Sequence, residues 1–172
     1  MSRFFLVGFS GAGKTTNAKR VAKECKLELL DTDVLIEQKM QMSISDIINQ
    51  EGERTFRKIE HEILLECIEK DNFIMSTGGG LPCFYDNMDI MLNNGVCFYL
   101  KMNAKMLSQR VMSSWKERPL LKNQANMAEY IQEQLVVRRY YYERANFVVN
   151  SLGGCHKELI KYIQQIQEID IN

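Results

Sequence analysis

Residues 8–15 read GFSGAGKT and match the spacing GxxxxGK[ST] at every defined position. The segment follows an apolar run, Phe4 to Val7, and precedes a helical pattern, which is the context that this motif requires. Glycines let backbone N–H groups turn toward phosphate oxygens, and the positive end of the following helix adds to the attraction. Lys14 would contact the β- and γ-phosphates, and the Thr15 hydroxyl would bind Mg²⁺. The sequence therefore predicts a phosphate site made by Gly11, Ala12, Gly13, Lys14, Thr15 and Thr16.

Other uses of this glycine-rich segment fit less well. A dinucleotide fingerprint, GxGxxG beginning at Gly11, needs a glycine at position 16, where a threonine stands. A glycine-rich turn with an idle lysine remains the alternative that involves no ligand.

Two carboxylates follow the second apolar run of the sequence, Leu27 to Leu30. Asp31 and Asp33 would emerge at the carboxyl end of a buried strand, which is the edge of an open α/β sheet where ligands bind. We expect Asp31 to serve Mg²⁺, through water, and Asp33 to orient an acceptor hydroxyl and take its proton. The alternative is a helix N-cap before residues 34–38, where aspartate is favoured.

Several arginines and a glycine run complete the candidate chemistry. Arg57 is three positions before Glu60 on a predicted helix, so a carboxylate neighbour can hold its guanidinium. Gly78, Gly79 and Gly80 follow a buried strand and give a backbone that a ligand can approach closely, although a simple tight turn is the alternative. Arg118 and Arg138 are further candidates, because a guanidinium suits carboxylate and phosphate. Each arginine taken singly is equally consistent with a surface charge.

These residues need a scaffold of strands and helices, which the hydrophobic pattern supplies. Short apolar runs typical of buried parallel strands alternate with amphipathic helical patterns, and alternation of this kind predicts an α/β sandwich with parallel pairing. The predicted strands are Phe4 to Val7, Leu27 to Leu30, Phe73 to Met75, Val96 to Leu100 and Phe147 to Val149. The predicted helices include Tyr85 to Asn93, Ala104 to Val111, Met127 to Arg144 and His156 to Ile169.

Two local signals refine this scaffold. Ser43 followed by Asp46 predicts a capping box at the start of the helix that carries Arg57. The stretch Ser113 to Ala125 has neither a helical nor a strand period, and we interpret it as a mobile loop or lid.

Length and composition bound the remaining possibilities. The 172 residues fit one domain, and a hydrophobic content of 45% is enough for one core. A net charge of zero gives no general attraction to nucleic acid or to an anionic membrane. The five cysteines form no CxxC pair, which favours unreactive thiols in a reducing compartment over zinc or disulfides. With no signal peptide or membrane-spanning run at the start, we expect a cytoplasmic monomer.

Taken together, these segments resemble the shikimate kinase family from Ser2 to about Asn150. The matching motifs occur in family order: GFSGAGKT, DTD at residues 31–33, GERTFRKIE around Arg57, STGGG at 76–80, ERPLL around Arg118, and Arg138 four residues before Tyr142. The resemblance implies transfer of the ATP γ-phosphate to the 3-hydroxyl of shikimate, in the route to aromatic amino acids. It also implies one domain over residues 1–172, a three-layer α/β/α sandwich with a five-stranded parallel sheet in the order 2-3-1-4-5, and a lid at about 113–125.

The same resemblance implies a role for each matching residue. It places the shikimate carboxylate on Arg57 and Arg138, and the ring hydroxyls on Asp33 and the glycine run. Arg118 would close over the phosphates from the lid, and Arg110 would lie along the adenine. The residues after Arg138 depart from the family spacing, which leaves Arg139 as the alternative carboxylate ligand.

Two rival functions use the same phosphate motif. Another small-molecule kinase of this fold, such as a gluconate or nucleotide kinase, explains ERPLL and the paired arginines less well. A nucleotide-dependent switch without an acceptor is disfavoured because no guanine-reading NKxD segment occurs.

Overall fold

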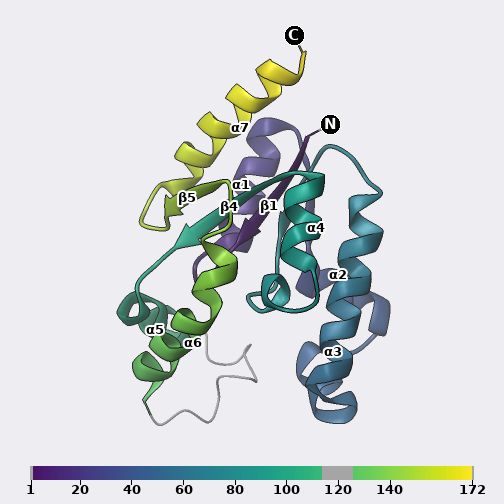
Figure 1. Cartoon of the computed structure of the whole chain (residues 1–172), viewed down its shortest axis with the longest axis vertical. Coiled ribbons are helices and arrows are strands. Elements are labelled where there is room, and N and C mark those ends of the chain that lie inside the picture. Colours follow the sequence, from purple (N-terminus) through teal and green to yellow (C-terminus); the bar gives the residue numbers. More distant parts are fainter. Residues whose placement is uncertain (1, 114–125, 172) are drawn as a thin grey trace.

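The computed structural model describes residues 2–113 and 126–171 and places five strands in one parallel sheet (Figure 1). The strand order is β2-β3-β1-β4-β5, as predicted. Each strand lies within one or two residues of its predicted position. Their bounds are β1 Arg3–Val7, β2 Glu28–Asp31, β3 Phe73–Ser76, β4 Val96–Lys101 and β5 Phe147–Asn150.

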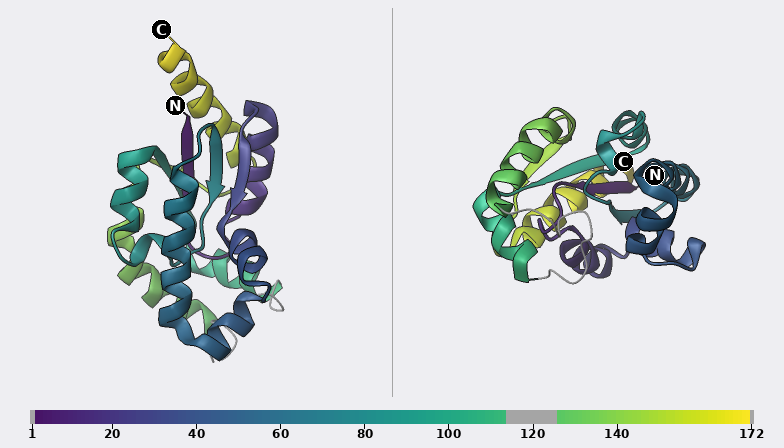
Figure 2. Two further views of the ribbon diagram at one scale, coloured as in Figure 1. Left: turned by 90° about the vertical axis from the view of Figure 1, so that its right-hand side faces the viewer. Right: turned by 90° about the horizontal axis from the view of Figure 1, so that it is seen from below.

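Helices cover both faces of this sheet, which explains why its central strands are apolar along their length. Figure 2 shows α1 and α7 on one face and α4 and α6 on the other. Neighbouring residues of β4 face opposite helical layers: Phe98 contacts Tyr162 of α7, and Tyr99 contacts Tyr142 of α6. The helices are α1 Lys14–Cys25, α2 Thr32–Met40, α3 Ile44–Ile68, α4 Asn87–Asn94, α5 Ala104–Ser113, α6 Met127–Tyr142 and α7 Cys155–Ile171, with a 3₁₀ turn, η1, at Leu81–Cys83. The predicted three-layer sandwich is therefore confirmed.

The cap predicted at Ser43 is present at the start of α3, where the Asp46 carboxylate accepts from the Ser43 hydroxyl. Ser43 is the N-cap, and its hydroxyl accepts a hydrogen bond of 3.1 Å from the Asp46 N–H. The helix is kinked at Gly52, where φ is 82°. Arg57 follows this kink and is buried. The cap at Ser43 determines where α3 begins, and the kink at Gly52 determines the direction of the segment that carries Arg57.

Some expectations about the elements need correction. Tyr85, predicted to lie in a helix, precedes α4 with a φ of 53°, and α6 ends at Tyr142, two residues before the predicted Arg144. Residues 114–125 lie outside the described part of the chain, and with them almost all of the predicted lid, including Arg118. All five cysteines are free thiols. Among the described residues, no helix is long and apolar enough to cross a membrane.

Candidate active site

The GFSGAGKT segment forms a turn between β1 and α1, at the carboxyl end of the central strand. Gly11 and Gly13 have φ angles of 89° and 86°, values that glycine adopts without the strain of a Cβ atom. Gly13 is the N-cap of α1 and has no side chain that could accept from the first N–H groups of the helix. A helix N-terminus of this kind attracts an anion.

Lys14 lies inside the curve of this turn. Its side chain is buried, and its ammonium group donates to the carbonyl oxygens of Gly8 at 2.7 Å and Phe9 at 3.0 Å. The loop therefore carries a fixed positive charge beside the helix N-terminus, as a polyphosphate requires.

Three side-chain oxygen atoms, one each from α1, β2 and β3, meet next to the phosphate turn. The Thr15 hydroxyl donates to Asp31 Oδ2 at 2.8 Å and lies 3.1 Å from the Ser76 hydroxyl. Within the described segments, no cluster of three or more His, Cys, Asp or Glu side chains could hold a metal on its own. Hydroxyls with one carboxylate fit Mg²⁺, which is bound through few protein groups and the phosphates of its substrate.

Asp31 also caps a helix, which was the structural alternative considered from the sequence. It is the N-cap of α2, and its Oδ1 accepts from the Asp33 N–H at 3.1 Å. Each carboxylate oxygen therefore has a different partner, and capping α2 holds the other oxygen toward Thr15. Asp33 lies in the first turn of α2, one residue beyond the buried Thr32.

Arg57 is held by two carboxylates and two rings. Its Nη1 donates to Glu60 Oε2 at 2.6 Å, and its Nε and Nη2 donate to Glu53 Oε1 at 3.2 and 2.9 Å. The guanidinium also lies over the rings of Phe56 and Phe84, at 5.0 and 4.4 Å from their centroids. A buried arginine fixed in this way presents a directed charge rather than a solvated one.

Glu60 connects the charged groups of this region. Burial raises its pKa to about 7, against the opposing effect of Arg57, and its remaining electrostatic neighbours are Asp33 and Arg138. Arg138 lies 5.0 Å from the centroid of the Phe9 ring, so it also touches the phosphate turn. The structure thus brings together Asp33, Arg57 and Arg138. Arg139, the alternative to Arg138, has a side chain 71% exposed and pairs with Glu143 instead.

The glycine run fills the space between the charged cluster and the phosphate turn. A Cβ atom at Gly78 would lie 2.5 Å from Glu60 Oε1, and one at Gly80 would lie 2.5 Å from Arg57 Nη1. A Cβ at Gly79 would lie 3.1 Å from the backbone nitrogen of Ser10, on the phosphate turn. The glycine run is therefore packed closely against the charged cluster on one side and the phosphate turn on the other, which a simple tight turn does not require.

Two N–H groups of this run are available to a ligand. The Gly78 N–H donates to the Thr32 hydroxyl at 2.7 Å, whereas those of Gly79 and Gly80 donate no hydrogen bond within the described residues. Gly80 is buried, and a buried N–H group requires a partner from a ligand or water.

Arg110 reaches the far side of the phosphate turn. Its Nη1 donates to the Gly11 carbonyl at 3.5 Å and lies close to Gly13. Ser151, after β5, donates to the Ala12 carbonyl and so ties a second loop to the same turn. Arg110 is therefore placed beside the phosphate turn, and its predicted contact with adenine stays a prediction.

The sequence missed some of the residues that build this site. Glu60 was recognised only as a neighbour of Arg57, although it also links Asp33 and Arg138. Thr32 and Ser76 lie within the DTD and STGGG segments, but no role was predicted for either of them. Ser76 pairs in register with Asp31 across β2 and β3, so the predicted strand order was the available signal for its position.

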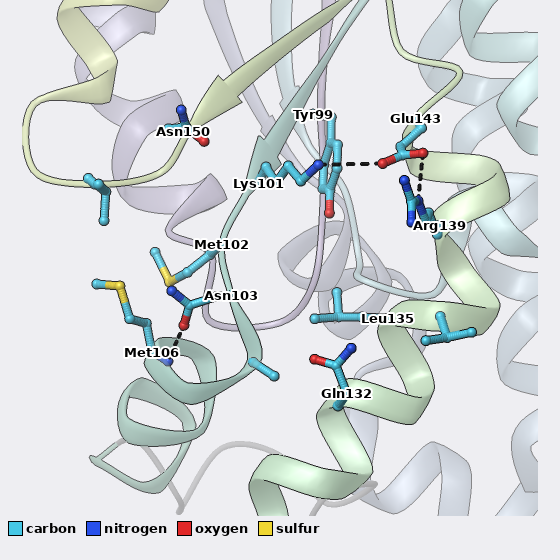
Figure 3. A pocket seen from close by; sticks show the side chains of 13 residues that line it. Tyr99, Lys101, Met102, Asn103, Met106, Gln132, Leu135, Arg139, Glu143 and Asn150 are labelled. Carbon is cyan, nitrogen blue, oxygen red and sulfur yellow. Dashed lines mark hydrogen bonds and ion pairs between the residues drawn. The ribbon is translucent and has the colours of Figure 1, made fainter.

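A separate cavity of about 410 Å³ opens between α5, α6 and the ends of β4 and β5 (Figure 3). Lys101 and Arg139 both pair with Glu143 on one side of it, while Met102 and Met106 line the opposite side. Arg139, the alternative to Arg138 as carboxylate ligand, is the one residue of this lining that the sequence analysis considered for binding. We assign it no part in the chemistry described above.

Comparisons with known proteins agree with the geometry of the site. The family model for shikimate kinase matches residues 10–167. A shikimate kinase of Azobacteroides pseudotrichonymphae is 40% identical over 151 residues, which cover 86% of this chain and 89% of that protein. The crystal structure of shikimate kinase from Bacteroides thetaiotaomicron has a TM-score of 0.87 at 31% identity and covers 97% of this chain and 98% of its own. Shikimate kinase from Acinetobacter baumannii in complex with shikimate has a TM-score of 0.89 at 30% identity and covers 99% and 94%. The chain therefore belongs to the shikimate kinase family.

Proposed function

We propose that this chain transfers the γ-phosphate of Mg²⁺-bound ATP to the 3-hydroxyl of shikimate, giving shikimate 3-phosphate and ADP. The observation that carries the proposal is the cluster of Asp33, Arg57, Glu60 and Arg138 beside the phosphate turn. A polyphosphate site alone would suit many enzymes. A site that also offers two arginines and a carboxylate suits a hydroxylated carboxylic acid as acceptor.

The nucleotide occupies the phosphate turn in this proposal. The backbone N–H groups of Gly11 to Thr16 hold the phosphate oxygens, and the Lys14 ammonium would move from the carbonyls of Gly8 and Phe9 to the transferring phosphate. Thr15, and Asp31 through water, would hold Mg²⁺, which would supply positive charge next to the phosphates. Arg110 lies beside the same turn and serves the adenine end of the nucleotide.

Shikimate occupies the charged cluster. Arg57 and Arg138 bind its carboxylate, because a guanidinium offers two parallel N–H donors to such a group. The burial of Arg57 and the exposure of Arg139 support Arg138 as its partner. The ring hydroxyls bind Asp33 and the backbone of Gly78, Gly79 and Gly80.

Asp33 orients the acceptor hydroxyl and accepts its proton as the new O–P bond forms. Phosphoryl transfer depends mainly on positioning and neutralisation of charge, so a carboxylate of ordinary basicity is sufficient. Arg118, in the segment outside the described residues, would add positive charge over the phosphates. Lys14 and Arg118 therefore stabilise the transferring group while Asp33 aligns the acceptor.

We extend the proposal to the state of the protein. The whole chain would act as one domain and as a monomer in the cytoplasm, with no nucleic acid or membrane partner. Its zero net charge supports the absence of such partners.

The test is an ADP-release assay on the purified chain with Mg²⁺ and ATP, in which shikimate, gluconate and nucleoside monophosphates are compared as acceptors. Turnover that requires shikimate supports the proposal, and ³¹P NMR of the product should show phosphate on the 3-hydroxyl. Turnover with gluconate or a nucleotide alone would reassign the acceptor. ATP hydrolysis indifferent to every acceptor would favour the switch hypothesis.

A further inference from the structure

Tyr142 connects two parts of the candidate acceptor site, the helix that carries Arg138 and the glycine run. It ends α6, one helical turn after Arg138, and its side chain is fully buried. Its hydroxyl donates to the carbonyl oxygen of Gly79 at 2.5 Å. This hydrogen bond connects the helix that carries one arginine with the glycine run that packs against the other.

The geometry of a peptide group gives this contact a consequence for ligand binding. The Gly79 carbonyl and the Gly80 N–H belong to the same planar unit, and no peptide bond among the described residues is cis. In a trans peptide these two groups point in opposite directions. Holding the carbonyl on the Tyr142 hydroxyl therefore directs the Gly80 N–H away from α6, and that N–H is one of the two with no protein partner in the described residues.

The surroundings of Tyr142 fix its own position. Its ring packs on Tyr99 of β4, with centroids 5.1 Å apart, which ties the end of α6 to the sheet. Burial raises the pKa of the Tyr142 hydroxyl far above its usual value, so the group keeps its proton and acts as a donor. The neighbouring Arg138 guanidinium interacts with the same hydroxyl and opposes this shift. The hydroxyl thus lies between Arg138 and Gly79.

We propose that Tyr142 is a positioning residue for the acceptor: it sets the orientation of the Gly79–Gly80 peptide and its distance from Arg138. The inference rests on the proposed function, since it concerns how shikimate is bound. It requires no contact between Tyr142 and substrate. Phosphate binding should be independent of it, because the phosphate turn is held by its own hydrogen bonds and by Ser151.

The test compares Tyr142→Phe with Tyr99→Phe. Both variants remove a hydroxyl from the same ring pair and keep the ring packing, but only the first removes the bond to Gly79. Tyr142→Phe should raise the KM and the Kd for shikimate about 5- to 20-fold and change the Kd for ADP less than about 2-fold. Tyr99→Phe should leave both ligands within about 2-fold of the wild type. The Kd values come from calorimetry, and circular dichroism checks that each variant is folded.

The outcomes separate the two levels of the argument. If the wild type does not turn over with shikimate, the proposed function fails, whatever the variants do. If the wild type is active and Tyr142→Phe binds shikimate as tightly as the wild type, the positioning role is wrong. It is equally wrong if Tyr142→Phe weakens shikimate and ADP alike, or if Tyr99→Phe reproduces its effect, since either result indicates a general loss of structure.

Discussion

The phosphate turn and the acceptor cluster are neighbours that are built in opposite ways. The turn comes from one continuous segment, and its hydrogen bonds are made largely within that segment, as with Lys14 and the carbonyls of Gly8 and Phe9. The acceptor cluster comes from α2, α3 and α6, and Glu60 faces Arg57 on its own helix and Asp33 and Arg138 on the other two. In the proposed function, the turn binds its ligand with backbone N–H groups and one lysine, whereas the cluster binds its ligand mainly with charged side chains.

This difference determines what each region needs from its ligand. The turn is held by its own hydrogen bonds and by Ser151, and an incoming phosphate would exchange one set of partners for another. The cluster holds two arginines, Asp33 and a Glu60 whose pKa is about 7, so at neutral pH part of its negative charge is missing. A bound carboxylate supplies that charge, which makes the acceptor part of the electrostatic balance of the site.

The strongest challenge to this comparison is Lys14→Ala. The substitution removes the only side-chain charge of the phosphate turn, and we expect kcat to fall at least about 1,000-fold because that charge acts on the transferring group. Lys19 is an exposed lysine farther along α1, and Lys19→Ala should leave kcat unchanged. Single-turnover kinetics measure the effect. A Lys14→Ala enzyme with nearly normal kcat would remove the turn from the chemistry.

The corresponding substitution on the acceptor side is Arg57→Ala. It removes a buried partner of the substrate and leaves Glu60 without its 2.6 Å ion pair, so we expect the KM for shikimate to rise about 100-fold. The KM for ATP should change little. Arg54→Ala, one turn earlier on the exposed side of α3, is the control. A change in the ATP constant instead would show that the two regions are not separable.

The unequal construction of the two regions also explains what the sequence could predict. The phosphate turn was readable because its residues are contiguous and its flanking strand and helix are visible as apolar and amphipathic patterns. The sheet order followed from the family resemblance, and the capping box at Ser43 from a local spacing. The phosphate turn and the cap depend on neighbours in the chain, whereas the sheet order was readable only through the resemblance.

Features that depend on tertiary packing were not readable in the same way. The distance between Arg138 and Glu60 depends on how α6 and α3 each pack against η1, and no local spacing encodes it. Ser76 begins the STGGG segment, but its place beside Thr15 depends on the pairing of β3 with β1 and β2. Tyr142 was noticed only as a spacing from Arg138. Its bond to Gly79 joins segments whose proximity appears only in the folded chain.

Gly80→Ala sharpens the comparison by changing the shape of the acceptor side without removing a charge. The new Cβ would lie 2.5 Å from Arg57 Nη1, so the guanidinium must move, and we expect the KM for shikimate to rise about 10-fold. Gly153→Ala is the matched control, because nothing lies within 4 Å of its Cβ position. Steady-state kinetics with each substrate varied would measure both. Equal effects of the two substitutions would mean that the close packing at Gly80 is unimportant.

The smallest predicted effect is a pH dependence of shikimate binding, which involves only the acceptor cluster. Glu60, with a pKa of about 7, faces Arg57, Asp33 and Arg138. A bound shikimate carboxylate adds negative charge nearby and favours the protonated form of Glu60, so binding takes up protons, and affinity falls as pH rises above 7. We expect the Kd for shikimate to increase about 3- to 10-fold between pH 6.5 and 8.5, while the Kd for ADP shows no corresponding dependence.

Glu60 can be separated from the other carboxylate that holds Arg57. Glu60→Gln removes the titrating group and should flatten the pH dependence of shikimate binding, whereas Glu53→Gln removes a half-exposed partner of Arg57 and should preserve it. Calorimetry in two buffers of different protonation enthalpy measures the proton uptake directly. A slope that persists in Glu60→Gln would assign the titration to another group, and a flat wild type would mean that Arg57 keeps Glu60 ionised throughout this range.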